Sequence, residues 1–174
     1  MSLETLKGSL RTVPDFPIPG ILFWDITTML KDAACLKELE ERLYDLYKDK
    51  GITKVVGIES RGYILGPALA IRLGAGFVMA RKPGKLPAET IRESFHKEYG
   101  EDAIEIHTDA ITPDDVVLVH DDLLATGGTT AAAVRLVKKF NPKAIYANFI
   151  IELDGLDGRK AFPDDIPVTS ILQL

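Results

Sequence analysis

One stretch, residues 116–129, constrains the fold of this chain more than any other. It opens with the apolar run Val116–Val119, which is typical of a strand buried on both faces, as in parallel sheets. Two acidic residues, Asp121 and Asp122, stand at the predicted end of this strand, and a short loop rich in glycine and threonine, residues 125–129, comes next. A helical pattern then begins. A strand, a tight loop and a helix in succession indicate an α/β architecture.

The rest of the chain alternates between the same two patterns. Short, apolar, β-branched runs predict strands, and apolar residues at intervals of three and four predict helices. The predicted strands are Lys54–Glu59, Gly76–Ala80, Ala103–His107, Val116–His120, Ala144–Ile151 and Val168–Leu172; the predicted helices are Lys31–Lys50, with Asp32 as N-cap, Tyr63–Leu73 and Thr129–Phe140. Three prolines in Val13–Gly20 predict an extended arm. We therefore expect an α/β fold with a mainly parallel sheet flanked by helices.

Composition narrows the class of protein. The 174 residues suit one domain, expected to span 1–174, and the net charge of −5 disfavours nonspecific binding of nucleic acid. Cys35 is the single cysteine, which excludes an intrachain disulfide and a zinc site built from cysteines. The apolar run Ile64–Ile71 is far shorter than the ~20 residues of a membrane span, and no signal peptide is readable. We expect a soluble, cytoplasmic protein with no membrane or nucleic-acid partner.

The junction between the acidic pair and the predicted helix suits a sugar phosphate. The first N–H groups of a helix lack internal partners, and glycines let a phosphate approach them closely. Carboxylates beside a phosphate would repel it, so Asp121 and Asp122 are better suited to accept hydrogen bonds from the vicinal hydroxyls of a ribose. The loop is not a Walker loop, because Gly128 is followed directly by Thr129. The alternative is a strand–turn–helix whose Asp pair only caps the helix.

A second unusual segment runs from Arg81 to Tyr99. It carries five basic and three acidic residues, a net charge of +2 in an acidic chain, together with two prolines and a glycine. We predict a long loop here, and loops of this length inside a compact domain are usually functional or disordered. Such a basic loop can close over an anion and exclude water, or it can be an ordinary solvated loop.

These residues resemble a known family. Residues 116–129 are similar to the phosphoribosyl-pyrophosphate motif of type I phosphoribosyltransferases. In particular, they resemble the sequence that this motif has in the adenine-specific branch of the family. Four further segments resemble that branch in the same order: Phe16–Phe23 with Asp25-Ile-Thr27, Glu59–Gly66, Arg81–Pro87 and Lys97–Gly100. The resemblance implies the type I phosphoribosyltransferase fold, with a twisted sheet, an N-terminal arm and hood over about residues 1–30, and a mobile catalytic loop over 82–99.

The resemblance also implies a reaction: the phosphoribosyl group of phosphoribosyl pyrophosphate passes to adenine, giving AMP and pyrophosphate in purine salvage. It assigns Glu98 and Arg81 to catalysis, and Glu93 is a rival to Glu98 on the same loop. The binding assignments are Asp121 and Asp122 for the ribose hydroxyls; Ala125, Thr126, Gly127, Gly128 and Thr129 for the 5-phosphate; Ser60, Arg61, Gly62, Arg81, Lys82 and Lys85 for the pyrophosphate; and Leu22, Phe23 and Trp24 for adenine. Taken alone, Arg61 would fit a surface ion pair, and Phe23 a cover for the core.

Magnesium is expected as a cofactor carried by the substrate phosphates, without direct protein ligands. The resemblance implies a homodimer. The histidines His96, His107 and His120 lack metal-ligand spacing and are predicted to be structural.

Two other functions remain as alternatives to the transfer of the phosphoribosyl group to adenine. One is a transferase specific for xanthine or hypoxanthine on the same fold. The other is a regulator that only senses phosphoribosyl pyrophosphate, which would need a DNA-binding appendage or a basic face.

Overall fold

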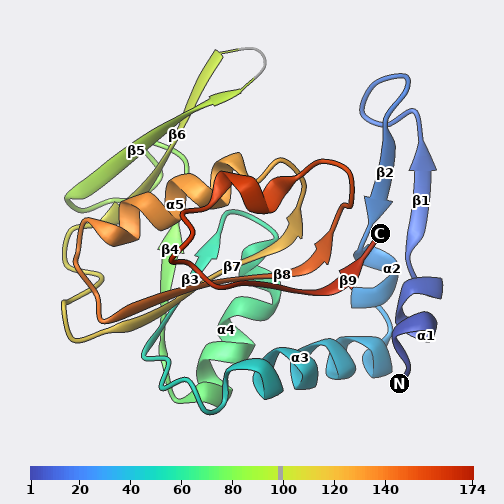
Figure 1. Ribbon diagram of the computed structural model, residues 1–174, viewed down its shortest axis with the longest axis horizontal. Helices are drawn as coiled ribbons and strands as arrows, with labels where there is room; N and C mark the ends of the chain where they lie inside the picture. The colour runs from blue at the N-terminus through green and yellow to red at the C-terminus, as the bar shows by residue number, and fades with distance from the viewer. Residues whose placement is uncertain (98–99) are drawn as a thin grey trace. The chain divides into compact units, whose positions relative to one another are not determined.

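The computed structural model describes residues 1–97 and 100–174 (Figure 1). The chain divides into two compact units, Met1–Arg42 and Leu43–Leu174. The first unit contains the proline-rich arm. The second contains the acidic pair, the loop of residues 125–129 and the described part of the basic segment.

The first unit contains a small antiparallel hairpin with short helices. Its elements are α1 (Leu3–Gly8), β1 (Arg11–Pro14), β2 (Leu22–Asp25), α2 (Thr27–Leu30) and the greater part of α3 (Ala33–Tyr47). The arm that was predicted to be extended forms the end of β1 and the turn to β2. In this turn Gly20 adopts a φ of +87°, which glycine tolerates without strain, and donates its N–H to the Asp15 side chain at 2.7 Å.

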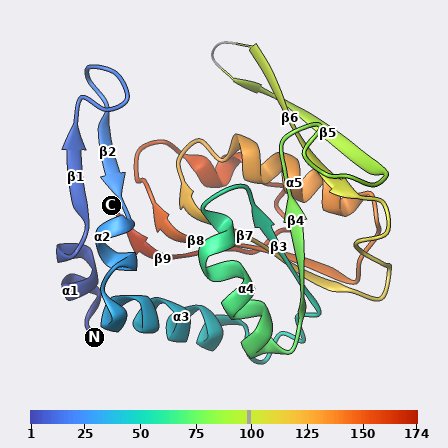
Figure 2. The ribbon, with the colours of Figure 1, turned by 180° about the vertical axis from the view of Figure 1, so that it is seen from behind.

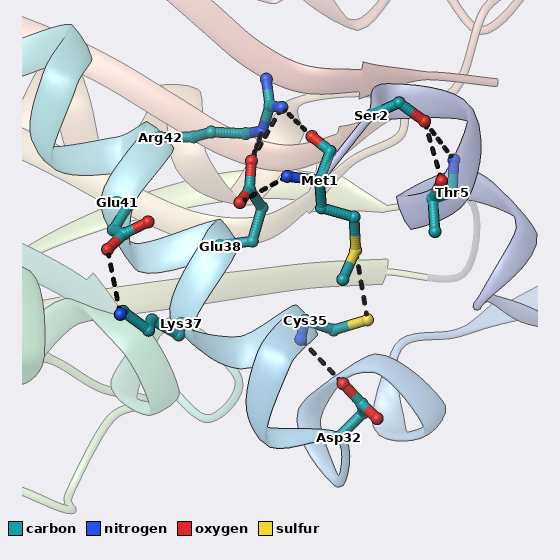
Figure 3. A network of polar contacts seen from close by, with 9 residues as sticks. All are labelled: Met1, Ser2, Thr5, Asp32, Cys35, Lys37, Glu38, Glu41 and Arg42. Carbon is teal, nitrogen blue, oxygen red and sulfur yellow. Dashed lines mark hydrogen bonds and ion pairs between the residues drawn. The ribbon is translucent and has the colours of Figure 1, made fainter.

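Helix α3 begins where the sequence predicts a cap. Asp32 Oδ1 accepts a hydrogen bond from the Cys35 N–H at 2.8 Å, which satisfies one of the free donors of the first turn. Glu38 then pairs with Arg42 one turn further along and with the amino group of Met1 (Figure 3). The helix is shorter than predicted, because it ends at Tyr47 rather than Lys50.

The second unit is built on a parallel sheet. Within the described residues the sheet has five strands in the order β4-β3-β7-β8-β9, and each neighbouring pair is parallel. The strands and helices are β3 (Lys54–Ile58), α4 (Gly62–Leu73), β4 (Gly76–Ala80), β7 (Val116–Leu124), α5 (Gly128–Lys138), β8 (Ala144–Glu152), the 3-10 turn η1 (Gly158–Ala161) and β9 (Val168–Gln173). Helix α4 lies against one face and α5 against the other (Figure 1, Figure 2). The predicted α/β fold is confirmed.

The apolar run Ile64–Ile71 forms most of α4, a helix of 12 residues. Pro67 lies inside this helix rather than in its first turn. Among the helices in residues 1–97 and 100–174, none is long and apolar enough to cross a membrane.

The basic segment contains a strand where the sequence predicted only a loop. Strand β5 (Thr90–Lys97) pairs antiparallel with β6 (Gly100–His107), so the loop prediction is wrong for residues 90–97. Ile91 and Phe95 pack into the core and Glu93 lies between them on the same side of the strand. This polar residue interrupts the apolar alternation by which a half-buried strand is recognised.

Strand β7 is longer than predicted. It does not end at His120 but continues through the acidic pair to Leu124. Pairing with β3 stops at Gly57 and His120, whereas pairing with β8 continues to Leu124 and Glu152. The acidic pair therefore lies on a strand that extends past its neighbour β3, at the carboxyl edge of the sheet.

Candidate active site

Most of the predicted ligand-binding residues of the second unit gather at one edge of its sheet. The strands are parallel, so their carboxyl ends share this edge, where ligands of open α/β sheets bind. From it β3 leads into residues 59–62, β4 into the basic segment, and β7 into the loop of residues 125–129. Two hollows of about 210 and 120 Å³ open here, and Asp121 and Thr129 line both of them. The hollows therefore adjoin and form one candidate site.

One residue of the acidic pair, Asp122, forms an ion pair with an arginine. Asp122 is only 4% exposed, and its Oδ2 forms an ion pair with Arg61 Nε at 2.7 Å. Burial and the neighbouring Asp122 carboxylate raise the pKa of Asp121 well above its ordinary value. Arg61 is thus not an isolated surface ion pair, because its partner is one of the two predicted ribose-binding carboxylates.

The loop of residues 125–129 presents the start of α5. Gly127 is the N-cap, with a φ of +81°, and no side chain bonds to it as a cap. Asp121 and Asp122 lie within β7 instead, so the interpretation of the acidic pair as a helix cap is wrong. The smaller hollow is lined by Asp121, Leu123, Ala125, Thr126, Gly127, Gly128, Thr129 and Thr130. Backbone donors at a helix start and threonine hydroxyls suit an anion.

A second glycine supports this loop, and the sequence analysis did not single it out. Gly158 begins η1 and packs so closely that a Cβ on it would overlap the Ala125 carbonyl oxygen and approach the Leu124 side chain to 2.8 Å. A Cβ on Gly127 would in turn lie 2.5 Å from the Gly158 carbonyl oxygen. Since the two glycines are 31 positions apart in the sequence, only the folded chain brings them together.

The larger hollow is lined by a charge pair from neighbouring strand ends. Arg81 contacts both carboxylate oxygens of Glu59, with Nη2 to Oε1 at 3.0 Å and Nε to Oε2 at 3.2 Å. The guanidinium lowers the pKa of Glu59, and the carboxylate raises the pKa of Arg81. Lys82 also lines this hollow, and its N–H donates to Glu59. Glu59 is a site residue to which the sequence analysis gave no role.

The two candidate catalytic glutamates have different outcomes. Glu98 lies outside the described residues. Glu93 forms ion pairs with Lys139, the residue that follows α5, at 2.7 Å and with Arg135 on α5 at 3.0 Å, and these two cations lower its pKa. A carboxylate held in this way is a weaker base, which disfavours Glu93 as the rival to Glu98.

The predicted adenine residues lie together in the first unit. Leu22, Phe23 and Trp24 are consecutive on β2, and the Phe23 ring packs edge-on against Phe16 with centroids 5.1 Å apart. Leu22 is 51% exposed, which leaves an apolar side chain available for contact. The role of these three residues in binding the base stays a prediction.

His120 is a structural residue in a chain of buried polar groups. Its Nδ1 lies 3.1 Å from Asn148 Oδ1, Asn148 donates to Thr169 Oγ1 at 2.9 Å, and the Tyr47 hydroxyl lies 2.6 Å from the same Oγ1. The ring is fully buried, and burial lowers the pKa of His120 to about 4. This chain links β7, just before the acidic pair, to β8, β9 and α3.

We expect this histidine to make stability depend on pH. The unfolded chain binds a proton near the ordinary pKa of 6.5 and the folded chain only near 4, so the free energy of unfolding falls as the pH is lowered between these values. His120→Asn keeps a donor for Asn148 but does not titrate. Urea unfolding of both forms at several pH values should show their difference in stability shrinking from pH 6.5 towards 4. A constant difference would contradict this account.

Metal-ligating side chains do not cluster in the part of the chain that the structure describes: no three or more His, Cys, Asp or Glu residues there could together hold a metal ion. His107 instead accepts the Ala88 N–H through Nε2 at 3.3 Å. Two carboxylates of the site, Glu59 and Asp122, form ion pairs with Arg81 and Arg61 respectively.

Known proteins are similar to this chain in sequence and in fold. The phosphoribosyl transferase domain family matches residues 26–173. The adenine phosphoribosyltransferase of Phocaeicola vulgatus is 68% identical over 174 residues, which are 100% of both chains. The crystal structure of adenine phosphoribosyltransferase from Rhodothermus marinus has a TM-score of 0.93 and 55% identity, covering 99% of this chain and 98% of that one. The Saccharomyces cerevisiae enzyme, solved with an imino-altritol bisphosphate and adenine, has a TM-score of 0.91 and 39% identity over 98% of each chain.

These matches cover the whole sheet and the loops at its carboxyl edge. They agree with the motif that the sequence placed between β7 and α5, and with the parallel sheet that carries it. This chain therefore belongs to the phosphoribosyltransferase family and has its type I fold.

Proposed function

We propose that this chain transfers the phosphoribosyl group of phosphoribosyl pyrophosphate to adenine and releases AMP and pyrophosphate. One observation carries the proposal: Asp121 of the acidic pair, the loop of residues 125–129, and Arg81 and Lys82 of the basic segment line two adjoining hollows at the carboxyl edge of the sheet. The choice of adenine is supported by the full-length relatives, which are adenine phosphoribosyltransferases, and by the adenine bound in one of them.

In this proposal, acidic and basic groups of the site bind different parts of phosphoribosyl pyrophosphate. Residues 125–129 bind the 5-phosphate through backbone donors and threonine hydroxyls. Asp121 and Asp122 accept hydrogen bonds from the ribose hydroxyls. Ser60, Arg61, Gly62, Lys82 and Lys85 bind the pyrophosphate, because cations and backbone N–H groups suit a polyanion.

In the reaction, the bond between the anomeric carbon and the pyrophosphate oxygen breaks while a ring nitrogen of adenine bonds to that carbon. Positive charge builds on the ribose, and adenine loses a proton. Glu98 is proposed to accept this proton when the segment of residues 82–99 closes over the substrates and excludes water. Movement of this segment is expected outside two stretches: residues 82–85, where the N–H groups of Lys82 and Gly84 bond to Glu59 and Glu105, and residues 91–95, where Ile91 and Phe95 pack into the core.

Magnesium is proposed to enter with the substrate. This fits the site, since two of its carboxylates, Glu59 and Asp122, are paired with arginines while the pyrophosphate brings its own oxygen ligands. When bound, the ion neutralises part of the pyrophosphate charge.

Adenine is proposed to stack on Phe23 between Leu22 and Trp24. A homodimer and a cytoplasmic location complete the proposal.

Base preference tests the function. We expect the chain to form a nucleotide from phosphoribosyl pyrophosphate and adenine, and to use hypoxanthine, guanine and xanthine several orders of magnitude less well. A pocket that reads hydrogen-bonding edges leaves buried polar groups unpaired when the wrong base binds. Product formation with the four bases in parallel, compared as kcat/KM, measures this. Comparable use of hypoxanthine or xanthine would favour the alternative transferase, and binding of phosphoribosyl pyrophosphate without turnover would favour a sensor.

A further inference from the structure

The ion pair between Glu59 and Arg81 has no place in the division of work proposed above. A carboxylate repels a pyrophosphate, yet Glu59 follows β3 directly and lines the larger hollow. Arg81 follows β4, the neighbouring strand, with Ile58 opposite Ala80 in the register. The pair therefore ties together two adjacent strand ends at the point where the basic segment leaves the sheet.

Glu59 and Arg81 each form a further hydrogen bond besides those that join them to each other. Glu59 Oε2 also accepts the Lys82 N–H at 3.2 Å, so the carboxylate holds the backbone after Arg81 as well as its side chain. The third guanidinium nitrogen, Nη1, donates to the Lys85 carbonyl oxygen at 3.0 Å. Arg81 thus bridges the end of β3 and the far end of a turn, residues 81–85.

A second anchor holds the same turn from the other side. Glu105 on β6 pairs with Arg81 through backbone hydrogen bonds of 3.0 and 2.8 Å, and its side chain accepts the Gly84 N–H at 3.1 Å. Because these bonds do not involve Glu59, its loss should let the turn shift without unfolding the strand ends.

We propose that Glu59 is a positioning residue that acts through Arg81, and that the two together clamp the turn of residues 81–85 so that Lys82 lines the pyrophosphate hollow. This inference rests on the proposed function and revises one binding assignment that the resemblance implied: Arg81 serves the pyrophosphate through the turn, not as a direct ligand. A carboxylate in an anion site is then explained, because its charge is matched by the arginine it orients.

A double-mutant cycle tests the clamp. We expect Glu59→Ala and Arg81→Ala to raise the KM for phosphoribosyl pyrophosphate by similar factors of roughly ten to one hundred, the range expected for a lost hydrogen bond to a charged group. The double variant should be no worse than the worse single variant, since both changes break one unit. Glu59→Gln keeps one acceptor oxygen and should show a smaller rise.

Two further readouts separate positioning from general damage. The KM for pyrophosphate, measured in the reverse direction with AMP, should rise as the KM for phosphoribosyl pyrophosphate does, while the KM for adenine stays the same. Glu89→Gln removes a charge from an exposed glutamate of the same segment and should leave all three KM values unchanged.

The outcomes are distinct. Factors that multiply in the double variant, or an Arg81→Ala effect far larger than that of Glu59→Ala, would make Arg81 a direct ligand and overturn the clamp while AMP formation by the unaltered chain upholds the proposed function. A rise in the KM for adenine equal to that for phosphoribosyl pyrophosphate would also overturn it, as general damage. If the unaltered chain forms no AMP, the proposed function fails first, and the clamp falls with it.

Discussion

Replacing Asp121 and Asp122 together by asparagine is expected to impair the use of phosphoribosyl pyrophosphate strongly while the chain still folds. Hydrogen bonds to charged groups contribute about 1.5–3 kcal/mol each, so each lost contact costs roughly a ten- to hundredfold change in kcat/KM. Asparagine keeps the size of each side chain, and the two residues lie on β7, which is held by its ladder to β8.

The two single changes should not be equal. Asp122→Asn is expected to cost more, because it also removes the charge that holds Arg61. Asp121→Asn should cost less, because burial and the neighbouring Asp122 carboxylate raise the pKa of Asp121 and so already disfavour its negative charge. Steady-state kinetics with phosphoribosyl pyrophosphate as the varied substrate measures both.

Asp114→Asn is the matched control, since Asp114 precedes the amino end of the same strand and its side chain is 92% exposed. It should leave kcat/KM unchanged. Normal turnover by the double variant would remove the acidic pair from the ribose site.

Gly158→Ala is expected to displace the loop of residues 125–129, against which Gly158 packs. The added methyl group overlaps the Ala125 carbonyl oxygen, which is backbone and cannot swing away, so residues 125–127 must shift. Overpacking of this kind costs about 1–3 kcal/mol of stability, and a displacement of about 1 Å at a substrate-binding group can cost roughly a hundredfold in rate. We expect a lower melting temperature and a large fall in kcat/KM for phosphoribosyl pyrophosphate.

Gly128→Ala provides the comparison for stability. Its Cβ would meet only the Phe95 ring, at an ordinary 3.9 Å. This variant should melt close to the unaltered chain. If Gly158→Ala melted equally well and kept full activity, the close packing of η1 under the loop would have no part in building the site.

The sequence predicts the strands of the parallel sheet better than it predicts the hairpin of β5 and β6. Strands β3, β4, β8 and β9 are predicted to within one residue at each end, because buried parallel strands are uninterrupted apolar runs. Strand β5 is missed, because Glu93 occupies an inward position that Arg135 and Lys139 make acceptable. Its partners lie 42 and 46 residues further along the chain, and no local pattern reveals them.

By itself, the sequence determined the chemistry of the site: an acidic pair, a glycine- and threonine-rich loop before a helix, and a basic segment, since these depend on residue type and short spacing. Only the tertiary structure decided how these groups are paired. It joined Arg61 to Asp122 and Arg81 to Glu59, ruled out the acidic pair as a helix cap, and placed Gly158 against Ala125. Each of these contacts connects different elements, and such contacts arise only when the parallel strands bring their carboxyl ends to one edge.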